Sequence, residues 1–137
     1  MTNTMKLRVV TPESAFYEDD VDMVTLQGVD GEMGLLPQHI RMMTQMVPGE
    51  LVVRRKDGRD QFLAVGEGLV EVSSDRVDII TDMAVTAENI DEARAEEARQ
   101  RAAARLRERI SSEEVASVNA SLVRSLAQLR VKRRRLR

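Results

Sequence analysis

Residues 77–95 decide the fold, because the spacing of their apolar side chains changes from a strand pattern to a helix pattern. Their sequence is Val77-Asp-Ile-Ile-Thr-Asp-Met-Ala-Val-Thr-Ala-Glu-Asn-Ile-Asp-Glu-Ala-Arg-Ala95. The first part is short and rich in β-branched residues, which favour strands. Asn89 can cap a helix and precedes Glu92 by three positions, which is the spacing of a capping box. The change predicts strands before this point and helices after it.

The half before this point, from Lys6 to about Ala84, contains short apolar runs with the two-residue period of strands. Turn residues separate the runs, most clearly in Lys56-Asp-Gly-Arg59, which predicts a hairpin between two strands. The runs lie at 7–10, 21–26, 51–53, 62–65, 69–72 and 77–80. Many short strands with no helix between them favour an antiparallel sandwich or barrel.

The half after this point carries two apolar stripes with helical spacing, and Ser111 with Glu114 repeats the capping signature between them. The first stripe is narrow and rich in alanine, and consists of Ile90, Ala93, Ala98, Ala102, Leu106 and Ile110. The second stripe consists of Val115, Val118, Leu122, Leu126 and Leu129. Two helices joined near Ser111 form a hairpin. Its alanine-rich seam buries little apolar area, so we expect that the hairpin can open.

The predicted fold class is therefore β + α, an N-terminal antiparallel β-sandwich followed by a C-terminal two-helix hairpin. We expect residues 1–86 to form the sandwich domain and residues 87–137 the helical domain. Residues 1–87 carry eight Lys and Arg against fifteen Asp and Glu, a net charge of −7, whereas residues 88–137 carry thirteen against eight, a net charge of +5. Halves of opposite charge commonly serve different partners.

The composition excludes several classes of protein. Apolar residues make up 42% of the chain but aromatic residues only 2%, so the core must be aliphatic. The chain has no cysteine, which excludes disulfides and thiolate metal sites. The N-terminus shows no signal peptide, and no apolar run approaches the roughly 18–20 residues of a membrane span. We expect a protein without direct membrane insertion.

Enzymatic groups are scarce as well. The chain has one histidine, His39, and contains no nucleophile elbow, phosphate loop or dinucleotide fingerprint. The spacing of Gly28, Gly31 and Gly34 instead predicts a tight turn with positive φ angles. The acidic cluster at residues 18–22 lacks the ligand spacing of a calcium loop. The sequence therefore predicts no catalytic residue and no metal site.

Four motifs in order along the chain resemble the ε subunits of bacterial rotary ATP synthases. They are Val9-Val-Thr-Pro12, Gly31-Glu-Met-Gly-Leu-Leu-Pro-Gln-His39, Ile90-Asp-Glu-Ala-Arg-Ala95 and Ala127-Gln-Leu-Arg-Val131. Together with a strand half that precedes a two-helix half, they extend the resemblance over essentially the whole chain. The resemblance implies a non-catalytic subunit of the central stalk that couples proton transport to ATP synthesis. It also implies a peripheral position on the cytoplasmic face of the bacterial plasma membrane.

The resemblance assigns partners to two parts of the sandwich. It implies that the c-ring is contacted by Asp30, Gly31, Glu32 and Met33. It implies that the γ subunit is contacted by His39, Met42 and Met43. Methionine side chains adapt to irregular surfaces, which agrees with a role in binding.

The resemblance also implies that the helical hairpin is a mobile regulatory element. In the family the hairpin either folds onto the sandwich or extends along γ into the α/β catalytic head, where it blocks ATP hydrolysis. The basic residues implied to face the catalytic β subunit are Arg130, Lys132, Arg133, Arg134 and Arg135. Such an element requires two packings that differ by only a few kcal/mol.

A regulatory ATP site is the last implication, and no other cofactor is expected. Ile90, Asp91, Arg94 and Ala95 match the ATP-binding motif of the family. Arg101 lies two helical turns after Arg94, so both can face one ligand, and Arg124 corresponds to a basic contact from the second helix. Val85 and Gln128 depart from the residues of tight-binding members, which predicts weak binding. The alternative is that Asp91 and Arg94 form a pair on the helix surface.

Two other classes of function compete with this interpretation. A freestanding module could bind nucleic acid through the basic tail at residues 130–137. The net charge of −2 and the lack of aromatic residues in the tail argue against it. A small enzyme is disfavoured because a nucleophile and base are missing. We therefore expect no nucleic-acid partner.

Overall fold

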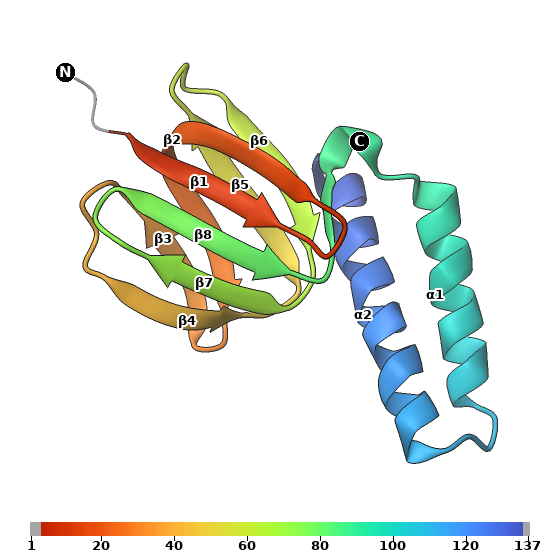
Figure 1. Ribbon diagram of the computed structural model, residues 1–137. Coiled ribbons are helices and arrows are strands. Elements are labelled where there is room, and N and C mark those ends of the chain that lie inside the picture. The colour runs from red at the N-terminus through yellow and green to blue at the C-terminus, as the bar shows by residue number, and fades with distance from the viewer. Residues whose placement is uncertain (1–3, 136–137) are drawn as a thin grey trace.

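The computed structural model describes residues 4–135 and shows a nine-stranded sandwich followed by two helices, as the sequence predicts (Figure 1). The strands are β1 (Met5–Val10), β2 (Ala15–Gly28), β3 (Gly31–Leu35), β4 (Met42–Met46), β5 (Gly49–Arg55), β6 (Asp60–Val65), β7 (Gly68–Val72), β8 (Arg76–Thr81) and β9 (Ala84–Thr86). A 3-10 turn, η1 (Ala87–Asn89), leads to the helices α1 (Glu92–Leu106) and α2 (Ser112–Arg135).

Strand β2 joins the two layers of the sandwich. One layer has the order β1-β8-β7-β4, and in the other β2 pairs with β3 and with β5, which continues to β6 and β9. The fourteen residues of β2 are long enough to pair with β1 as well as β5. The ladders are antiparallel, except that β1 and β8 run parallel. The predicted antiparallel sandwich is confirmed except at this one pair, where no short turn joins the two strands and dictates their direction.

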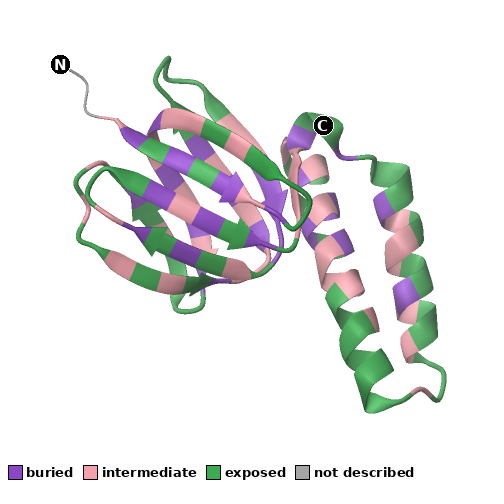
Figure 2. Ribbon diagram, viewed as in Figure 1, coloured by how far each residue is buried: buried purple, intermediate pink, exposed green. Residues whose placement is uncertain are grey.

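The core lies between the layers and is filled by alternate residues of each strand, since successive side chains of a strand point to opposite faces. In β1, Met5, Leu7 and Val9 are buried. In β8, Ile79 is fully buried, whereas its neighbour Ile80 is 60% exposed. Figure 2 shows the same alternation of buried and exposed residues along the strands.

The predicted hairpin between β5 and β6 is confirmed. Gly58 has a φ of 85°, and the carboxylate of Asp57 accepts the N–H of Arg59 at 2.9 Å. The predicted glycine turn is confirmed only at Gly31, whose φ is 122°. Gly28 and Gly34 lie in β2 and β3, where the pairing of the two strands places them in extended backbone.

The first helix begins later than the capping pattern predicts. Asn89 belongs to η1, and the helix cap is Asp91, whose carboxylate accepts the N–H of Arg94 at 3.1 Å. The delay arises because Ile90 is in an extended conformation and only 4% exposed, so its burial fixes the backbone before the helix. The second cap is confirmed, since the Ser111 hydroxyl accepts the N–H of Glu114 at 3.2 Å.

The two helices form the expected hairpin, and α2 lies between the sandwich and α1 (Figure 1). The predicted stripes match the buried residues in part, at Ile90, Ala102 and Leu129, whereas Val115 and Leu126 are 41% and 40% exposed. The buried residues of the helices are Ala95, Ala102, Ser125, Ala127, Leu129 and Val131. A single apolar stripe does not predict the buried residues of α2, because near its C-terminus the helix packs against both α1 and the sandwich. Its N-terminal turns extend away from the sandwich and are exposed (Figure 2).

The adjacent isoleucines of β8 test which side chains of this strand face the core. Replacing buried Ile79 with alanine should lower the free energy of unfolding by about 2–5 kcal/mol, because the side chain leaves a cavity in the aliphatic core. Ile80→Ala should cost within about 0.5 kcal/mol, since that side chain is mostly exposed. Urea unfolding followed by circular dichroism measures both values. An equal loss of unfolding free energy in the two variants would contradict the assignment of Ile79 to the core and Ile80 to the surface.

Candidate functional site

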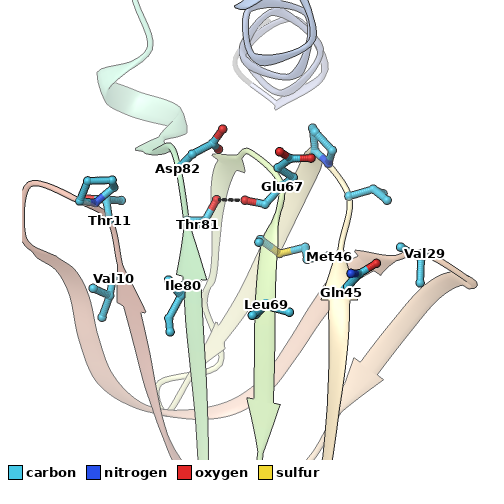
Figure 3. Close-up of a pocket in the computed structure, with 14 residues that line it drawn as sticks. Val10, Thr11, Val29, Gln45, Met46, Glu67, Leu69, Ile80, Thr81 and Asp82 are labelled. Atoms are coloured by element: carbon cyan, nitrogen blue, oxygen red, sulfur yellow. Dashed lines mark hydrogen bonds between the residues drawn. The ribbon is translucent and has the colours of Figure 1, made fainter. Parts of the chain in front are cut away.

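An apolar pocket of about 840 Å³ opens at one end of the β1-β8-β7-β4 layer (Figure 3). A row of neighbouring residues crosses the ladder there, from Val10 to Ile80, Leu69 and Gln45. Ile80 and Leu69 are 60% and 46% exposed, and Val29 beside the row is 52% exposed. Exposed apolar patches of this kind mark binding surfaces for other proteins.

The polar groups of this pocket do not form a catalytic arrangement. The hydroxyl of Thr81 donates to the carbonyl of Glu67 at 2.9 Å, which ties β8 to the turn before β7 (Figure 3). The carboxylates of Glu67 and Asp82 lie at its rim. Within residues 4–135, no three His, Asp or Glu side chains gather as a metal site would require. The pocket can therefore bind an apolar surface.

The residues expected to face γ lie on β4 and the loop before it. Met43 is 66% exposed, whereas Met42 is half-buried and packs against the core. Nδ1 of His39 donates to the carbonyl of Ile40 at 3.0 Å, and the Ile40 side chain is 81% exposed. The structure thus places an exposed isoleucine and methionine together on the layer that carries the apolar pocket.

The residues expected to face the c-ring form the turn between β2 and β3. Asp30, Gly31 and Glu32 are exposed, and Met33 is half-buried. The Glu32 carboxylate accepts a hydrogen bond from the side-chain amide of Gln27 at 3.3 Å, which orients it on the neighbouring strand. The turn presents acidic and apolar groups together at its tip.

The hairpin brings most of the expected ATP-binding residues to one pocket of about 340 Å³. Asp91, Arg94, Ala95 and Arg101 line it from the side of α1. Ser125 and Gln128 line it from α2. Two guanidinium groups suit a phosphate ligand because their donors fork toward paired oxygens.

Two of the expected ATP-binding residues lie elsewhere. Ile90 is buried in a small apolar cluster with Ala64, Ala87 and Val131. Arg124 forms an ion pair with Asp82 at 3.3 Å, which joins α2 to the segment after β8. Asp91 serves as the cap of α1, so its carboxylate is already used by the helix backbone.

The basic end of α2 is held by acidic residues of the same chain. Arg133 contacts Glu92 at 2.7 Å and Glu96 at 3.2 Å, both on α1. Arg135 contacts both carboxylate oxygens of Glu50 on β5 at 2.7 and 2.6 Å, and Arg134 lies 3.9 Å from the same carboxylate. Lys132 donates to the carbonyl of Ala87 at 3.3 Å. Leu136 and Arg137 of the predicted basic tail lie outside the described residues.

These contacts shift the ionisation of the groups involved. A hydrogen bond from Arg99 lowers the pKa of Glu96 to about 2, with Gln100 and Arg133 acting in the same direction. Hydrogen bonds to Glu92 and Glu50 raise the pKa of Arg133 and Arg135 respectively. The Arg133 contacts join α2 to α1, whereas the Arg135 contact joins α2 to β5.

Comparison with known proteins accounts for both halves of the chain. The family model of the ATP synthase delta/epsilon chain β-sandwich domain matches residues 4–87. The model of the long α-helix domain of the same chain matches residues 88–133. The chain belongs to the ATP synthase delta/epsilon family. The resemblance seen in the four sequence motifs is confirmed.

Curated ATP synthase epsilon chains of bacteria are similar over most of their length. That of Bacillus subtilis is 43% identical over 103 residues, which cover 75% of this chain and 77% of the relative. That of Dehalococcoides mccartyi CBDB1 is 39% identical over 133 residues, which cover 96% of this chain and 94% of the relative. The epsilon chain of Hydrogenovibrio crunogenus is 35% identical over 129 residues.

Solved structures of ATP synthases share the epsilon-type fold. A chain of the Euglena gracilis mitochondrial ATP synthase, from a structure of OSCP, F1 and c-ring, superposes with a TM-score of 0.73 at 24% identity. The match covers 88% of this chain and 76% of that one. A chain of the Tetrahymena thermophila central stalk and c-ring superposes with a TM-score of 0.59 at 13% identity. At these identities the likeness supports the fold alone.

The sequence did not predict the apolar surface at the end of the β1-β8-β7-β4 layer. Val29, Leu69 and Ile80 are exposed there, but each lies in a stretch whose pattern is typical of a buried strand or a turn. The usable signal was the alternation in β8, where Ile80 follows Ile79 and must point to the opposite face. The role of Glu50 as the partner of Arg135 was not predicted, because a single acidic residue in a strand belongs to no recognisable motif.

Glu96 gives a pH-dependent test of the hairpin. Its lowered pKa means that its contribution to stability is present above pH 4.5 and is lost as the pH falls toward 2. NMR titration of the side chain should give an apparent pKa of about 2. Arg99→Gln should raise this pKa more than Arg133→Gln does, because Arg99 supplies the largest interaction.

Glu97→Gln is the matched control for this titration, since it removes a neighbouring carboxylate from an exposed position of the same helix. It should leave the midpoint of Glu96 in place. A midpoint of Glu96 near 4.5 in the unmodified chain would contradict its pairing with Arg99 within α1, and a midpoint that Arg133→Gln leaves unchanged would contradict its contact with α2.

Proposed function

We propose that the chain is a non-catalytic stalk subunit that links γ to the c-ring, couples proton transport to ATP synthesis and restrains ATP hydrolysis through its helices. Family membership supplies the general role. The exposed apolar face of the sandwich is the observation that carries the finer assignment, because an aliphatic surface without catalytic groups serves binding. The complex holds the protein at the cytoplasmic face of the plasma membrane. The helices within residues 4–135 lack the length and apolar character that crossing a bilayer requires.

The γ subunit is the proposed partner of the β1-β8-β7-β4 layer. Met43, Leu69 and Ile80 are exposed on this layer, and Ile40 adds the most exposed large apolar side chain of those named here. Their burial against γ would contribute free energy in proportion to the apolar area removed from water. His39 lies at the edge of the same surface, next to Ile40.

The β2–β3 turn is the proposed contact with the c-ring. Asp30 and Glu32 are exposed there beside Met33, and the positive φ of Gly31 sets the direction of the tip. The turn therefore has a mixed acidic and apolar tip. Val29, which precedes Asp30, donates its N–H to the carbonyl of Gln45 at 3.2 Å, so the turn adjoins the apolar row and the two proposed rotor contacts are neighbours.

The hairpin is the proposed regulatory element. Its docked form uses the ion pair of Arg135 with Glu50 on β5 and a small apolar cluster, so undocking exposes little apolar area. On extension, Arg130, Lys132, Arg133, Arg134 and Arg135 would meet acidic residues of the catalytic β subunit. Because Arg133, Arg134 and Arg135 already contact carboxylates in the docked form, the two states exchange similar contacts and can lie close in free energy.

Reconstitution with the other stalk and head subunits tests the surface assignment. Ile80→Asp should weaken binding to γ about tenfold or more, because a charge would be buried in an apolar contact. Lys56→Asp, at the exposed tip of the β5–β6 hairpin and outside the apolar face, is the control and should bind γ normally. Binding is measured by surface plasmon resonance. Normal binding of Ile80→Asp would exclude this face as the γ surface.

Removal of the hairpin tests the regulatory assignment. A chain ending before Asn89 keeps β1–β9 and should still assemble and support ATP synthesis. It should raise the ATP hydrolysis rate of the reconstituted complex, because the restraining element is gone. Hydrolysis equal to that of the full-length complex would show that the hairpin is structural here.

ATP binding by the docked hairpin is the second proposal, favoured by the pocket that Arg94 and Arg101 share. At about 340 Å³ it lies at the low end of ligand sites, which span roughly 300–1,000 Å³. Arg124 is turned toward Asp82, and Gln128 offers an amide where a charge would bind phosphate more strongly. ATP would therefore bind weakly and favour the docked hairpin, since both helices contribute to the pocket.

Calorimetric titration of the full chain with ATP measures this binding directly. Arg94→Ala should reduce the affinity about tenfold to a hundredfold, the equivalent of one lost hydrogen bond to a charged group. Arg109→Ala, in the loop between the helices, is the matched control and should bind like the unmodified chain. Heat that Arg94→Ala leaves unchanged would show that ATP binds elsewhere.

A further inference from the structure

One face of α2 contacts the sandwich through four residues that we call the docking stripe: Arg124, Gln128, Val131 and Arg135. Their spacing of four, three and four places them on one side of the helix. Arg124 contacts Asp82, and the Gln128 amide donates to the sulfur of Met83 at 2.9 Å. Val131 is the one apolar member of the stripe and is fully buried. The stripe is therefore mainly polar, unlike the aliphatic core of the sandwich.

Arg135 makes the most extensive polar contact of this stripe. Its guanidinium group donates to both oxygens of Glu50, at 2.7 and 2.6 Å. The same group lies 4.3 Å from the ring centroid of Phe62, one of the two phenylalanines of the chain. Glu50 and Phe62 lie on adjacent strands. Glu50 alternates with buried Gly49 and Leu51, and Phe62 packs with Ala64 in the cluster that faces α2, whereas Leu63 and Val65 belong to the core of the sandwich.

The burial of this pair distinguishes it from the other ion pair of the stripe. The side chain of Glu50 is 11% exposed and that of Arg135 is 27% exposed, whereas Arg124 and Asp82 are 36% and 39% exposed. Exposed pairs contribute little because water screens them. A shielded bidentate pair differs, because removal of one partner leaves the other charge desolvated without compensation.

We propose that Arg135, Glu50 and Phe62 form an electrostatic latch that sets the fraction of chains with a docked hairpin. The inference rests on the proposed function, in which the hairpin leaves the sandwich. Undocking frees the Arg135 guanidinium group, which then binds a carboxylate-bearing surface of the catalytic head. Glu50 and that surface therefore compete for one arginine, so strengthening the latch shifts the population toward the docked state.

The latch is tested first on the isolated full-length chain. Since the chain has no cysteine, Ser74→Cys on the sandwich and Asn119→Cys on α2 provide two unique spin-labelling sites. Pulsed electron paramagnetic resonance then measures the distance between sandwich and hairpin. Arg135→Glu should lower the docked-to-undocked ratio about tenfold to a hundredfold, the equivalent of a lost hydrogen bond to a charged group. Arg135→Gln should act in the same direction and more weakly.

Charge reversal separates the latch from general loss of stability. The exchange Glu50→Arg with Arg135→Glu restores an opposite-charge pair and should recover most of the docked population. Arg109→Glu, which makes the same charge change in the exposed loop between the helices, should leave docking unaltered. Circular dichroism confirms that each variant keeps its strands and helices. Docking of Arg135→Glu equal to the unmodified chain, or no recovery in the exchange, would overturn the latch.

Salt provides a second measurement on the same labelled chains. Raising the ionic strength to about 1 M shortens the screening length to about 3 Å and should lower the docked fraction. The double variant Glu50→Gln with Arg135→Gln should lose part of this dependence, because the charges of the latch are absent while the exposed pair of Arg124 and Asp82 remains. Unchanged salt dependence in the double variant would place the responsible charges elsewhere and overturn the latch.

The assembled complex then separates the latch from the proposed function. Glu50→Gln should undock the hairpin while keeping Arg135 and the other basic residues of α2, so ATP hydrolysis should fall as the extended form becomes more populated. If Glu50→Gln undocks the isolated chain but hydrolysis does not change, the latch stands and the regulatory role of the hairpin is contradicted. If the isolated chain stays docked, the latch itself fails.

Discussion

The small apolar contact between α2 and the sandwich is the constraint on which the arrangement of the two halves depends. Val131 packs there with Ala64, Ala87 and Ile90, and three of these four side chains are fully buried. Burying one valine contributes about 1.5–3 kcal/mol, so this cluster alone holds the hairpin only modestly. The polar contacts around it therefore decide how firmly the hairpin is docked.

The sandwich, in contrast, is stabilised independently of the hairpin. Its buried side chains are almost entirely aliphatic and come from both layers, and β2 connects the layers by pairing with β1 and β5. A core of this kind can hold the outward-facing residues in fixed positions. It allows Ile80 and Met43 to stay exposed at a binding surface without loss of the fold.

Basic side chains link the physical behaviour of the hairpin to its proposed regulation. Arg133 joins α2 to α1 through Glu92 and Glu96, whereas Arg135 joins α2 to β5 through Glu50. The first contact stabilises the hairpin itself, and the second attaches it to the sandwich. A partner with acidic groups can replace the second contact while the sandwich keeps its own core.

The sequence by itself determined the β + α class, the β5–β6 hairpin, the cap at Ser111 and the family, because local spacing and turn chemistry suffice for these. The sequence also predicted that Arg94 and Arg101 face one pocket, since a helix places residues two turns apart on the same side. Only the tertiary structure decided the parallel pairing of β1 and β8 and the partners of Arg124 and Arg135. Glu50 and Arg135 are 85 residues apart, and no local pattern encodes a contact that packing creates.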